Sequence, residues 1–183
     1  MITAHMLCAA ILSLGLPNAD TACSYSGEVV EAALTNELDP TVLAALIFVE
    51  SNWEVRARNR NSGACGLTQV LPRFTNPRLT CRQLREDGAL SIRTGARQLA
   101  GWISRATQYR GNSLHRGLCG YNAGNVCFNP EHWRSSGMRY ARRVTRLASQ
   151  IRQVALNLQA DIEDSAIEQE TEIGYDFDYG CGL

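Results

Sequence analysis

The sequence predicts an all-α fold for this chain of 183 residues. Apolar residues recur at three- and four-residue steps over long stretches, which gives a helix one buried face. Residues that favour helix starts precede these stretches, and the sequence contains neither an alternating strand pattern of useful length nor an internal repeat. A chain of this length can bury one sizeable core. We therefore expect a single domain that ends in a long C-terminal helix and an acidic tail.

Composition and charge restrict the class of protein. Hydrophobic residues make up 45% and charged residues 20% of the chain, which excludes a wholly disordered or membrane-embedded protein. All 18 basic residues are arginines, the last of them Arg152, whereas residues 161–183 contain only acids among their strongly charged side chains. The chain therefore combines a basic domain with an acidic tail. A basic surface also suits nucleic acid, but no recognisable binding motif accompanies these arginines, so we expect no nucleic-acid specificity.

The first apolar stretch, Met6 to Leu16, allows more than one interpretation. It is too short for a transmembrane span and has the length of the central part of a secretory signal. No Lys or Arg precedes it, and the small residues near Ala19 and Ala22 form a poor cleavage site. A helix that packs on the domain, or a segment that docks on a hydrophobic partner, explains the stretch about as well as a signal does.

The next helix is predicted from Thr41 to Trp53, because Asp39 suits the N-cap and Pro40 the first helical position. Apolar residues share one face of this helix with Glu50, namely Val42, Leu43, Leu46, Ile47 and Val49. Loss of water around the carboxylate should raise the pKa of Glu50, as a general acid working near neutral pH requires. The alternative is a glutamate at a helix end that pairs with a nearby arginine.

Three further helices follow. Ser91 is the expected cap of the first, whose apolar positions continue until a break at residues 109–112, and these positions are Ile92, Ala96, Leu99, Trp102, Ile103 and Ala106. A short helix is expected from about Ser113. The last helix has a narrow apolar seam at Tyr140, Val144, Leu147, Ile151, Val154 and Leu158. We expect this seam to pack within the chain rather than on a partner.

Seven cysteines are more than a cytosolic enzyme of this size normally carries, so we expect disulfides and an oxidising compartment. At least two bridges should form within the set Cys23, Cys65, Cys81, Cys119, Cys127 and Cys181. The sequence has no Cys-x-x-Cys pair and only three histidines. A structural zinc site is therefore not expected, and no cofactor is implied.

Three segments in order carry a family resemblance, and a fourth supports it. Glu50-Ser51 resembles the catalytic Glu-Ser pair of the SLT-type lytic transglycosylases, lysozyme-like enzymes that cut bacterial peptidoglycan. The segments 66–69 and 120–124 resemble their Gly-Leu-Met-Gln loop and Ala-Tyr-Asn-Ala-Gly segment, and Tyr140 with Val144 resembles their closing helix. Thr68 replaces the usual methionine and Gly120 the usual alanine. The resemblance implies a lysozyme-like domain at residues 36–150, with a lead-in at 1–35 and an extension at 151–183.

The resemblance also implies roles for single residues. Glu50 would be the catalytic acid, Ser51 would orient Glu50 or the substrate's N-acetyl group, Gln69 would bind the glycan and Tyr121 would line the cleft. Thr68, Asn122 and Tyr140 complete the expected substrate-binding set, with Thr68 shaping one sugar subsite. Alternatives stay open: Ser51 can satisfy local backbone, Gln69 can brace the loop, Tyr121 can be core, and Asn122 can be a buried amide that ties the loop together. The lysozyme-like fold brings Cys65 and Cys119 around one cleft, so a bridge between them is conceivable.

The mechanism depends on the number of carboxylates. Ordinary glycosidases use two, yet residues 55–85 contain no Asp or Glu, and Glu54 is expected to pair with Arg56 and Arg58. With Glu50 alone, the resemblance implies cleavage between N-acetylmuramic acid and N-acetylglucosamine with formation of a 1,6-anhydro product. A hydrolytic muramidase and a wall-binding structural protein without activity are the alternatives.

The biological setting is expected to be a bacteriophage virion that opens the host cell wall, in the periplasm, as phage DNA enters the cell. A bacterial enzyme secreted to the periplasm for envelope assembly is the alternative. Residues 161–183 mix acids with apolar and aromatic residues, which suits docking on a basic surface. We expect them to bind neighbouring virion or envelope-assembly subunits rather than to cover the cleft of their own chain.

Overall fold

The computed structural model describes residues 1–129 and 136–175, and from residue 163 onward only the backbone. The all-α prediction is confirmed: within these ranges the chain forms helices and only two isolated β-bridges, both in the loop at residues 58–70. The elements in chain order are α1 (Ala4–Ser13), α2 (Ala19–Ser24), α3 (Ser26–Thr35), α4 (Pro40–Ser51), the 3-10 turn η1 (Pro72–Phe74), α5 (Cys81–Glu86), α6 (Gly88–Ala106), α7 (Ser113–Ala123), the 3-10 turn η2 (Gly124–Phe128) and α8 (Ser136–Tyr175).

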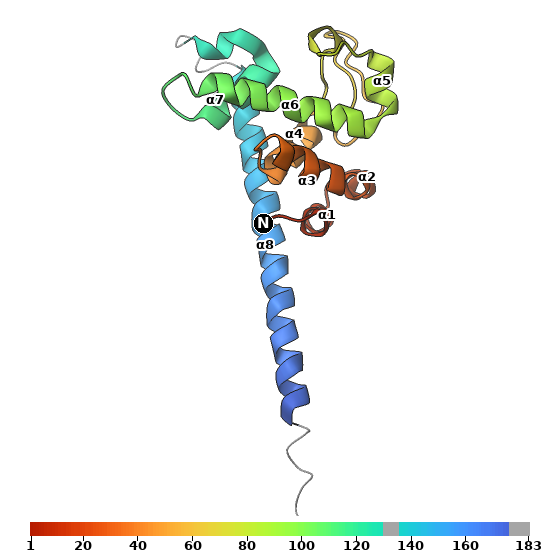
Figure 1. The fold of residues 1–183 in the computed structure, drawn as a ribbon, viewed down its shortest axis with the longest axis vertical. Helices are drawn as coiled ribbons and strands as arrows, with labels where there is room; N and C mark the ends of the chain where they lie inside the picture. The colour runs from red at the N-terminus through yellow and green to blue at the C-terminus, as the bar shows by residue number, and fades with distance from the viewer. Residues whose placement is uncertain (130–135, 176–183) are drawn as a thin grey trace, which may run out of the picture.

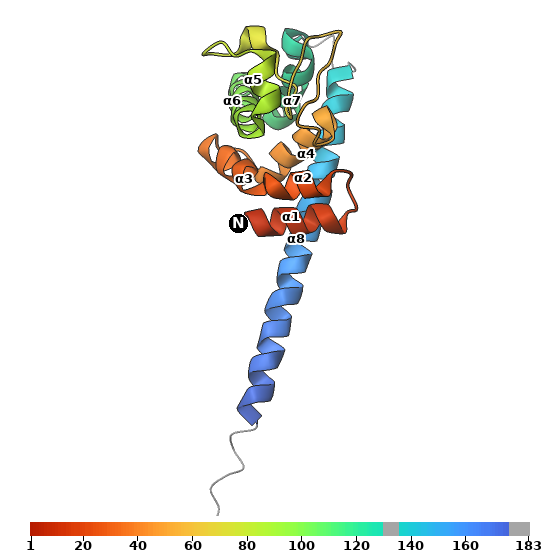
Figure 2. The same cartoon turned by 90° about the vertical axis from the view of Figure 1, so that its right-hand side faces the viewer.

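The helices form a head around the first half of α8. Figures 1 and 2 show α6 lying across the head near one end of α8, with α1, α2 and α3 grouped below it. Helices α1, α4 and α7 all pack against α8, and α6 packs against α7. The second half of α8 extends beyond the head (Figure 1). This arrangement packs α4, which carries Glu50, against both α3 and α8.

Helix α4 begins as predicted and is buried all round. Asp39 caps it by accepting a hydrogen bond from the backbone N–H of Thr41, and Pro40 occupies the first turn. Residues 40–47 are all buried, so the expected single apolar face is wrong: α4 is a core helix that contacts neighbours on every side. It ends at Asn52, whose φ of 53° is left-handed. Glu50 and Ser51 therefore lie in the last turn, where the helix leaves the core.

Helix α1 packs on the domain. It buries Met6, Leu7, Ala10 and Ile11 in the main core, and a disulfide from Cys8 fastens it to α2. Of the interpretations that the sequence allowed for this stretch, the packed helix is the one that the structure contains. No single helix in the described part of the chain has the length and hydropathy of a membrane span.

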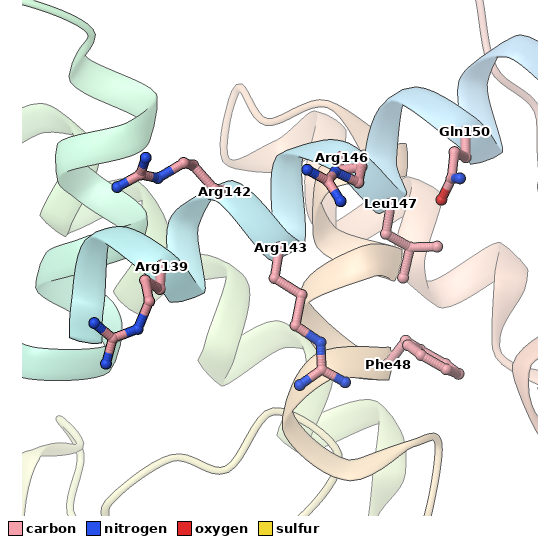
Figure 3. Close-up of a pocket in the computed structure, with 7 residues that line it drawn as sticks. All are labelled: Phe48, Arg139, Arg142, Arg143, Arg146, Leu147 and Gln150. Carbon is pink, nitrogen blue, oxygen red and sulfur yellow. The ribbon is translucent and has the colours of Figure 1, made fainter. Parts of the chain in front are cut away.

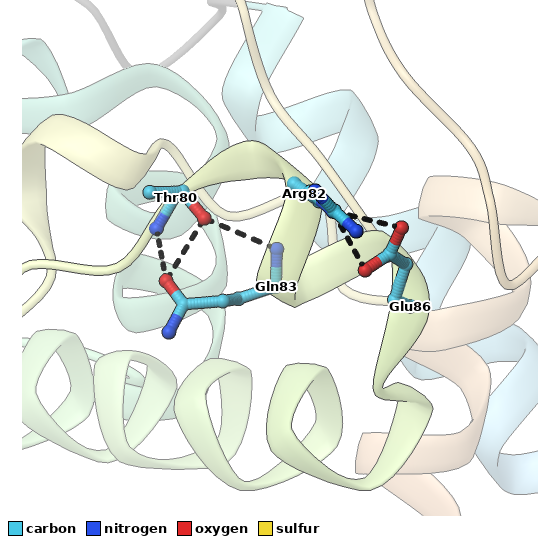
Figure 4. A network of polar contacts seen from close by, with 4 residues as sticks. All are labelled: Thr80, Arg82, Gln83 and Glu86. Carbon is cyan, nitrogen blue, oxygen red and sulfur yellow. Dashed lines mark hydrogen bonds and ion pairs between the residues drawn. The ribbon is translucent and has the colours of Figure 1, made fainter.

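Helices α5 and α6 begin at side-chain caps. In α5 the Thr80 hydroxyl accepts the Gln83 backbone N–H while the Gln83 side chain accepts the Thr80 backbone N–H, a capping box that Figure 4 shows beside the exposed Arg82–Glu86 ion pair. The expectation that Ser91 caps α6 is wrong. Asp87 caps it one turn earlier, by accepting from the Leu90 N–H.

The apolar seam of α8 packs inside the chain, as predicted. Val144 and Ile151 are fully buried, and Tyr140, Leu147 and Val154 pack against the same core. Leu158 is half-buried, and Ile162 is exposed by 58%. The head therefore stops covering α8 near residue 158. Most side chains of the acidic segment 161–183 lie outside the described residues.

Among the residues that the structure describes, three disulfides are present, Cys8–Cys23, Cys65–Cys81 and Cys119–Cys127. The prediction of at least two bridges within the named set is confirmed, although Cys8 was not in that set. The bridge between Cys65 and Cys119 is wrong, because these residues lie in separate apolar clusters. Cys65 is buried with Val70 and Leu84 beside α5, whereas Cys119 is buried against η2. Cys181 lies outside the described residues.

Candidate active site

The side chain of Glu50 contacts a tyrosine that lies far from it in the sequence. The hydroxyl of Tyr140 on α8 donates a hydrogen bond of 2.6 Å to Glu50 Oε1. The two residues are 90 positions apart in the chain, and the packing of α8 on α4 brings them together. The carboxyl group is partly buried, so it combines an apolar setting with access to the surface.

Burial dominates the electrostatics of Glu50. Loss of water around the charged form raises the pKa of this carboxyl to about 7, and the hydrogen bond from Tyr140 opposes the rise. Burial and the nearby Glu50 charge raise the pKa of the Tyr140 hydroxyl well above its usual value. Tyr140 therefore stays protonated and acts only as a donor. Glu50 can hold or release a proton near neutral pH, which is the property of a general acid and base.

A second tyrosine fixes the loop opposite Glu50. Tyr121 on α7 donates a hydrogen bond of 2.7 Å to the backbone carbonyl of Thr68. Burial, followed by the charge of Glu50, raises the pKa of Tyr121, so this hydroxyl also stays protonated. The contact ties α7 to the loop at residues 66–69.

Glu50 lies where two hollows meet. The larger, of about 950 Å³, runs between the loop at residues 59–74, α6 and the segment 120–125. The smaller, of about 560 Å³, runs past the end of α4. Glu50, Asn59 and Gln69 line both hollows, which we call the larger and the smaller arm of one cleft. A linear molecule lying through both arms would pass directly over the Glu50 carboxyl group.

Ser51 and Gln69 line the cleft and also contact local backbone. Ser51 donates a hydrogen bond of 3.1 Å to the carbonyl of Ile47 and lines the smaller arm. Gln69 has a left-handed φ of 49°, and its amide Nε2 donates 2.9 Å to the Gly66 carbonyl while the side chain lines both arms. The amide group of Gln69 can still accept a hydrogen bond from a ligand through its oxygen.

The role expected for Thr68 in a sugar subsite needs correction. Its side chain is fully buried, and its hydroxyl donates 2.8 Å to the Ser91 carbonyl in α6. A Cβ on Gly95 would lie 2.4 Å from Thr68 Cβ, so the missing side chain of Gly95 is what makes room for Thr68. Thr68 faces α6 rather than the cleft and contributes its backbone carbonyl to Tyr121.

The segment 120–125 forms one wall of the larger arm. Asn122 is exposed and lines that arm, so the alternative of a buried structural amide is wrong. Gly120 stands where the resembling family usually has alanine, and the packing explains the glycine. A Cβ at this position would lie 2.7 Å from Trp102 Cε3 and 3.2 Å from Phe128 Cε2. Trp102 can therefore pack closely against Gly120 and still line the cleft.

Several cleft residues were not predicted from the sequence. Trp102 was assigned to the core by its helical spacing, yet it lines the larger arm together with Arg105 from the next turn of α6. Phe74, exposed by 66%, forms an edge of the same arm. Phe48 and Arg143 line the smaller arm. Phe74 could have been predicted as a binding residue, because an aromatic residue in a polar stretch of sequence is typical of a binding surface.

Glu54 lies in the smaller arm, four residues after Glu50. It is exposed, and its carboxylate accepts the backbone N–H of Arg56 at 3.1 Å in place of the expected arginine ion pairs. No cluster of three potential metal ligands occurs among the residues that the structure describes. The site thus offers one partly buried acid of raised pKa, Glu50, between two arms, and a second, exposed carboxylate, Glu54, in the smaller arm.

Comparison with known families identifies the domain. The sequence model of the Transglycosylase SLT domain matches residues 28–159, which include every residue that lines the two arms.

Proposed function

The chain belongs to the SLT transglycosylase domain family, whose members are lyases acting on peptidoglycan, and we propose that it cleaves the bond between N-acetylmuramic acid and N-acetylglucosamine with formation of a 1,6-anhydro end. The single observation that carries this proposal is the position of Glu50. A carboxyl group with a pKa of about 7 lies at the junction of two arms that together can hold a glycan strand.

The proton transfer follows from this geometry. Glu50, protonated below about pH 7, donates its proton to the bridging oxygen as the bond from that oxygen to the muramic C1 breaks. The substrate's own N-acetyl oxygen stabilises the positive charge at C1. Tyr140 then stabilises the Glu50 carboxylate by its hydrogen bond, so the acid becomes a base of fixed orientation.

The second step reuses the same group. The Glu50 carboxylate takes the proton from the C6 hydroxyl, and the C6 oxygen forms the new bond to C1. The acid is regenerated and no water is consumed. This route needs only one carboxylate, which agrees with a cleft in which Glu50 is the acid shared by both arms.

The test is the substitution Glu50→Gln. The amide is nearly isosteric and cannot donate the proton, so the rate of muropeptide release from purified peptidoglycan should fall by about 10²–10⁴-fold while the circular dichroism spectrum stays unchanged. Glu54→Gln is the matched control and should retain activity. If Glu50→Gln keeps more than about a tenth of the wild-type rate, a positioned general acid is not at work and the assignment fails.

A hydrolytic muramidase is the second candidate, because Glu54 lies in the smaller arm and could activate a water molecule. Product masses separate the two reactions. Hydrolysis adds one water to the new reducing end, whereas the proposed route gives anhydro-muropeptides. Mainly reducing-end products, together with loss of activity in Glu54→Gln, would favour the hydrolase.

For the biological setting we propose a bacteriophage virion component that opens the wall locally, with a secreted periplasmic enzyme as the alternative. The three disulfides support an oxidising compartment in either case. Residues 161–183 would bind a neighbouring subunit. Detection of the protein in purified virions supports the first setting, and detection only in periplasmic extract of uninfected cells supports the second.

A further inference from the structure

A row of arginines surrounds a third hollow beside the cleft. This hollow, of about 580 Å³, is lined by Phe48 from α4 and by Arg139, Arg142, Arg143, Arg146, Leu147 and Gln150 from α8. Figure 3 shows Arg143 and Leu147 extending from α8 toward Phe48. Steps of three and four residues place Arg139, Arg143 and Arg146 on one face of the helix. The hollow therefore has an apolar side and a strongly basic side.

The four arginines carry unbalanced charge. All four are exposed, and none forms an ion pair with the acids that the structure describes. Like charges three and four residues apart on a helix destabilise it. A multiply charged anion bound in the hollow would remove this repulsion, and guanidinium groups bind carboxylates with paired hydrogen bonds.

The hollow adjoins the smaller arm of the cleft. Phe48 and Arg143 line both this hollow and the smaller arm, and the smaller arm reaches Glu50. A ligand that lies across Glu50 and fills the smaller arm therefore arrives at the arginines. Arg58 lines the smaller arm and Arg105 the larger arm as single arginines, whereas four arginines line this hollow.

We infer that the arginine hollow binds the carboxylates of the peptide stems that peptidoglycan strands carry. The inference rests on the proposed function, which places a glycan strand in the cleft. Each muramic residue bears a short acidic peptide, so a strand held in the smaller arm brings carboxylates to the arginines and aliphatic side chains to Phe48 and Leu147. An acidic protein segment offers the same carboxylates, but nothing in the cleft would deliver it to this place.

The test compares three soluble strands: one with acidic stems, one with stems whose carboxylates are amidated, and one whose stems an amidase has removed. The full-length wild type should show the lowest KM for the acidic stems. The double substitution Arg139→Gln/Arg146→Gln, which touches neither arm, should raise that KM by roughly three- to tenfold with kcat unchanged, as expected for two exposed charge pairs. The preference of the variant for acidic over amidated stems should be smaller than that of the wild type, because Arg142 and Arg143 remain.

Arg82→Gln removes an exposed arginine on α5 and is the matched control, which should keep the wild-type preference. An equal preference for acidic stems in the double variant and the wild type, or a wild type that does not distinguish acidic from amidated stems, overturns the inference. If sedimentation instead shows that the wild type self-associates, and the double variant is monomeric and still prefers acidic stems as the wild type does, the arginines bind the acidic segment of a second copy.

Fluorescence anisotropy of strand binding tests the binding of acidic stems separately from the proposed cleavage of the glycan. Preferential binding of acidic stems without cleavage by the wild type refutes the proposed function alone.

Discussion

At the residue scale, burial and one opposing hydrogen bond together set the pKa of Glu50. The Tyr140 hydroxyl favours the charged form of Glu50 and so holds its pKa below the value that burial alone would give. Because the first step of the proposed route needs protonated Glu50, kcat/KM should fall as pH rises through about 7. Tyr140→Phe should move this descending limb to higher pH and lower kcat at the optimum. A pH profile of muropeptide release checks both effects, with Tyr25→Phe as the control.

The raised pKa of Glu50 also costs stability. The folded-state pKa of about 7 exceeds the ordinary glutamate value of 4.5, so the folded protein holds this proton more tightly and loses stability as pH rises from about 4.5 through 7. Glu50→Gln removes this cost. The free energy of unfolding should rise at pH 8, by an upper bound of roughly 3 kcal/mol, and should change much less at pH 4. Urea unfolding at the two pH values measures the difference, and an equal effect at both would contradict the burial argument.

The sequence singled out Glu50 as the candidate acid but did not predict every contact around it. Glu50 could be recognised because a carboxyl group among apolar helical positions is chemically unusual. Thr68 could not be placed correctly, because the direction of a loop side chain depends on its neighbour in space. That neighbour is Gly95, 27 positions later in the numbering.

At the element scale, the contact between α6 and the loop at residues 66–69 depends on one glycine. Gly95→Ala would place a methyl group 2.4 Å from Thr68 Cβ, inside a packed core. We expect a loss of about 1–3 kcal/mol of stability and a lower kcat/KM, because Thr68 also positions Tyr121 through its carbonyl. Thermal unfolding and cleavage assays measure the two effects.

Gly101→Ala on the same helix is the stability control, because nothing lies within 4 Å of a Cβ at that position. Alanine there should stabilise the helix by about 0.5–1 kcal/mol. If both glycine substitutions have the same effect on the melting temperature, helix propensity rather than the Thr68 contact decides the outcome.

Helix boundaries were predictable where a cap and an apolar pattern agreed. Asp39 with Pro40 fixed the start of α4, and Ser113 marked α7. In α6 the apolar pattern was predicted correctly but the N-cap was not. Asp87 and Ser91 are both good N-cap residues, and only the burial of Ser91 against Thr68 decides between them. Local propensity cannot supply that tertiary contact.

At the scale of the whole molecule, the three disulfides of the described residues cross-link different parts of the head. The segment between Cys119 and Cys127 contains cleft residues Tyr121 and Asn122, whereas the segment between Cys8 and Cys23 contains none. Replacing either pair with alanine should cost about 2–4 kcal/mol of stability. Only the Cys119/Cys127 variant should also lose kcat/KM. Equal activity of the two variants at a temperature where both are folded would show that the bridge does not shape the cleft.

The overall fold followed from the sequence more readily than the pairing of its cysteines. Helical patterns act over a few residues, so α4, α6, α7 and α8 could all be recognised locally. Pairing depends on which loops lie together, and here each bridge joins cysteines that are adjacent in the sequence order. The predicted bridge from Cys65 to Cys119 skipped one cysteine.

The hydrogen bond between Glu50 and Tyr140 also bears on the synthesis of the protein. A ribosome that has added residues 1–139 has made the acid but neither its tyrosine partner nor most of α8, the helix against which α1, α4 and α7 pack. Such a chain has no completed core around Glu50. Chains released early by the ribosome are therefore expected to be inert toward the wall, and a cell that makes this enzyme is protected from unfinished copies without needing an inhibitor.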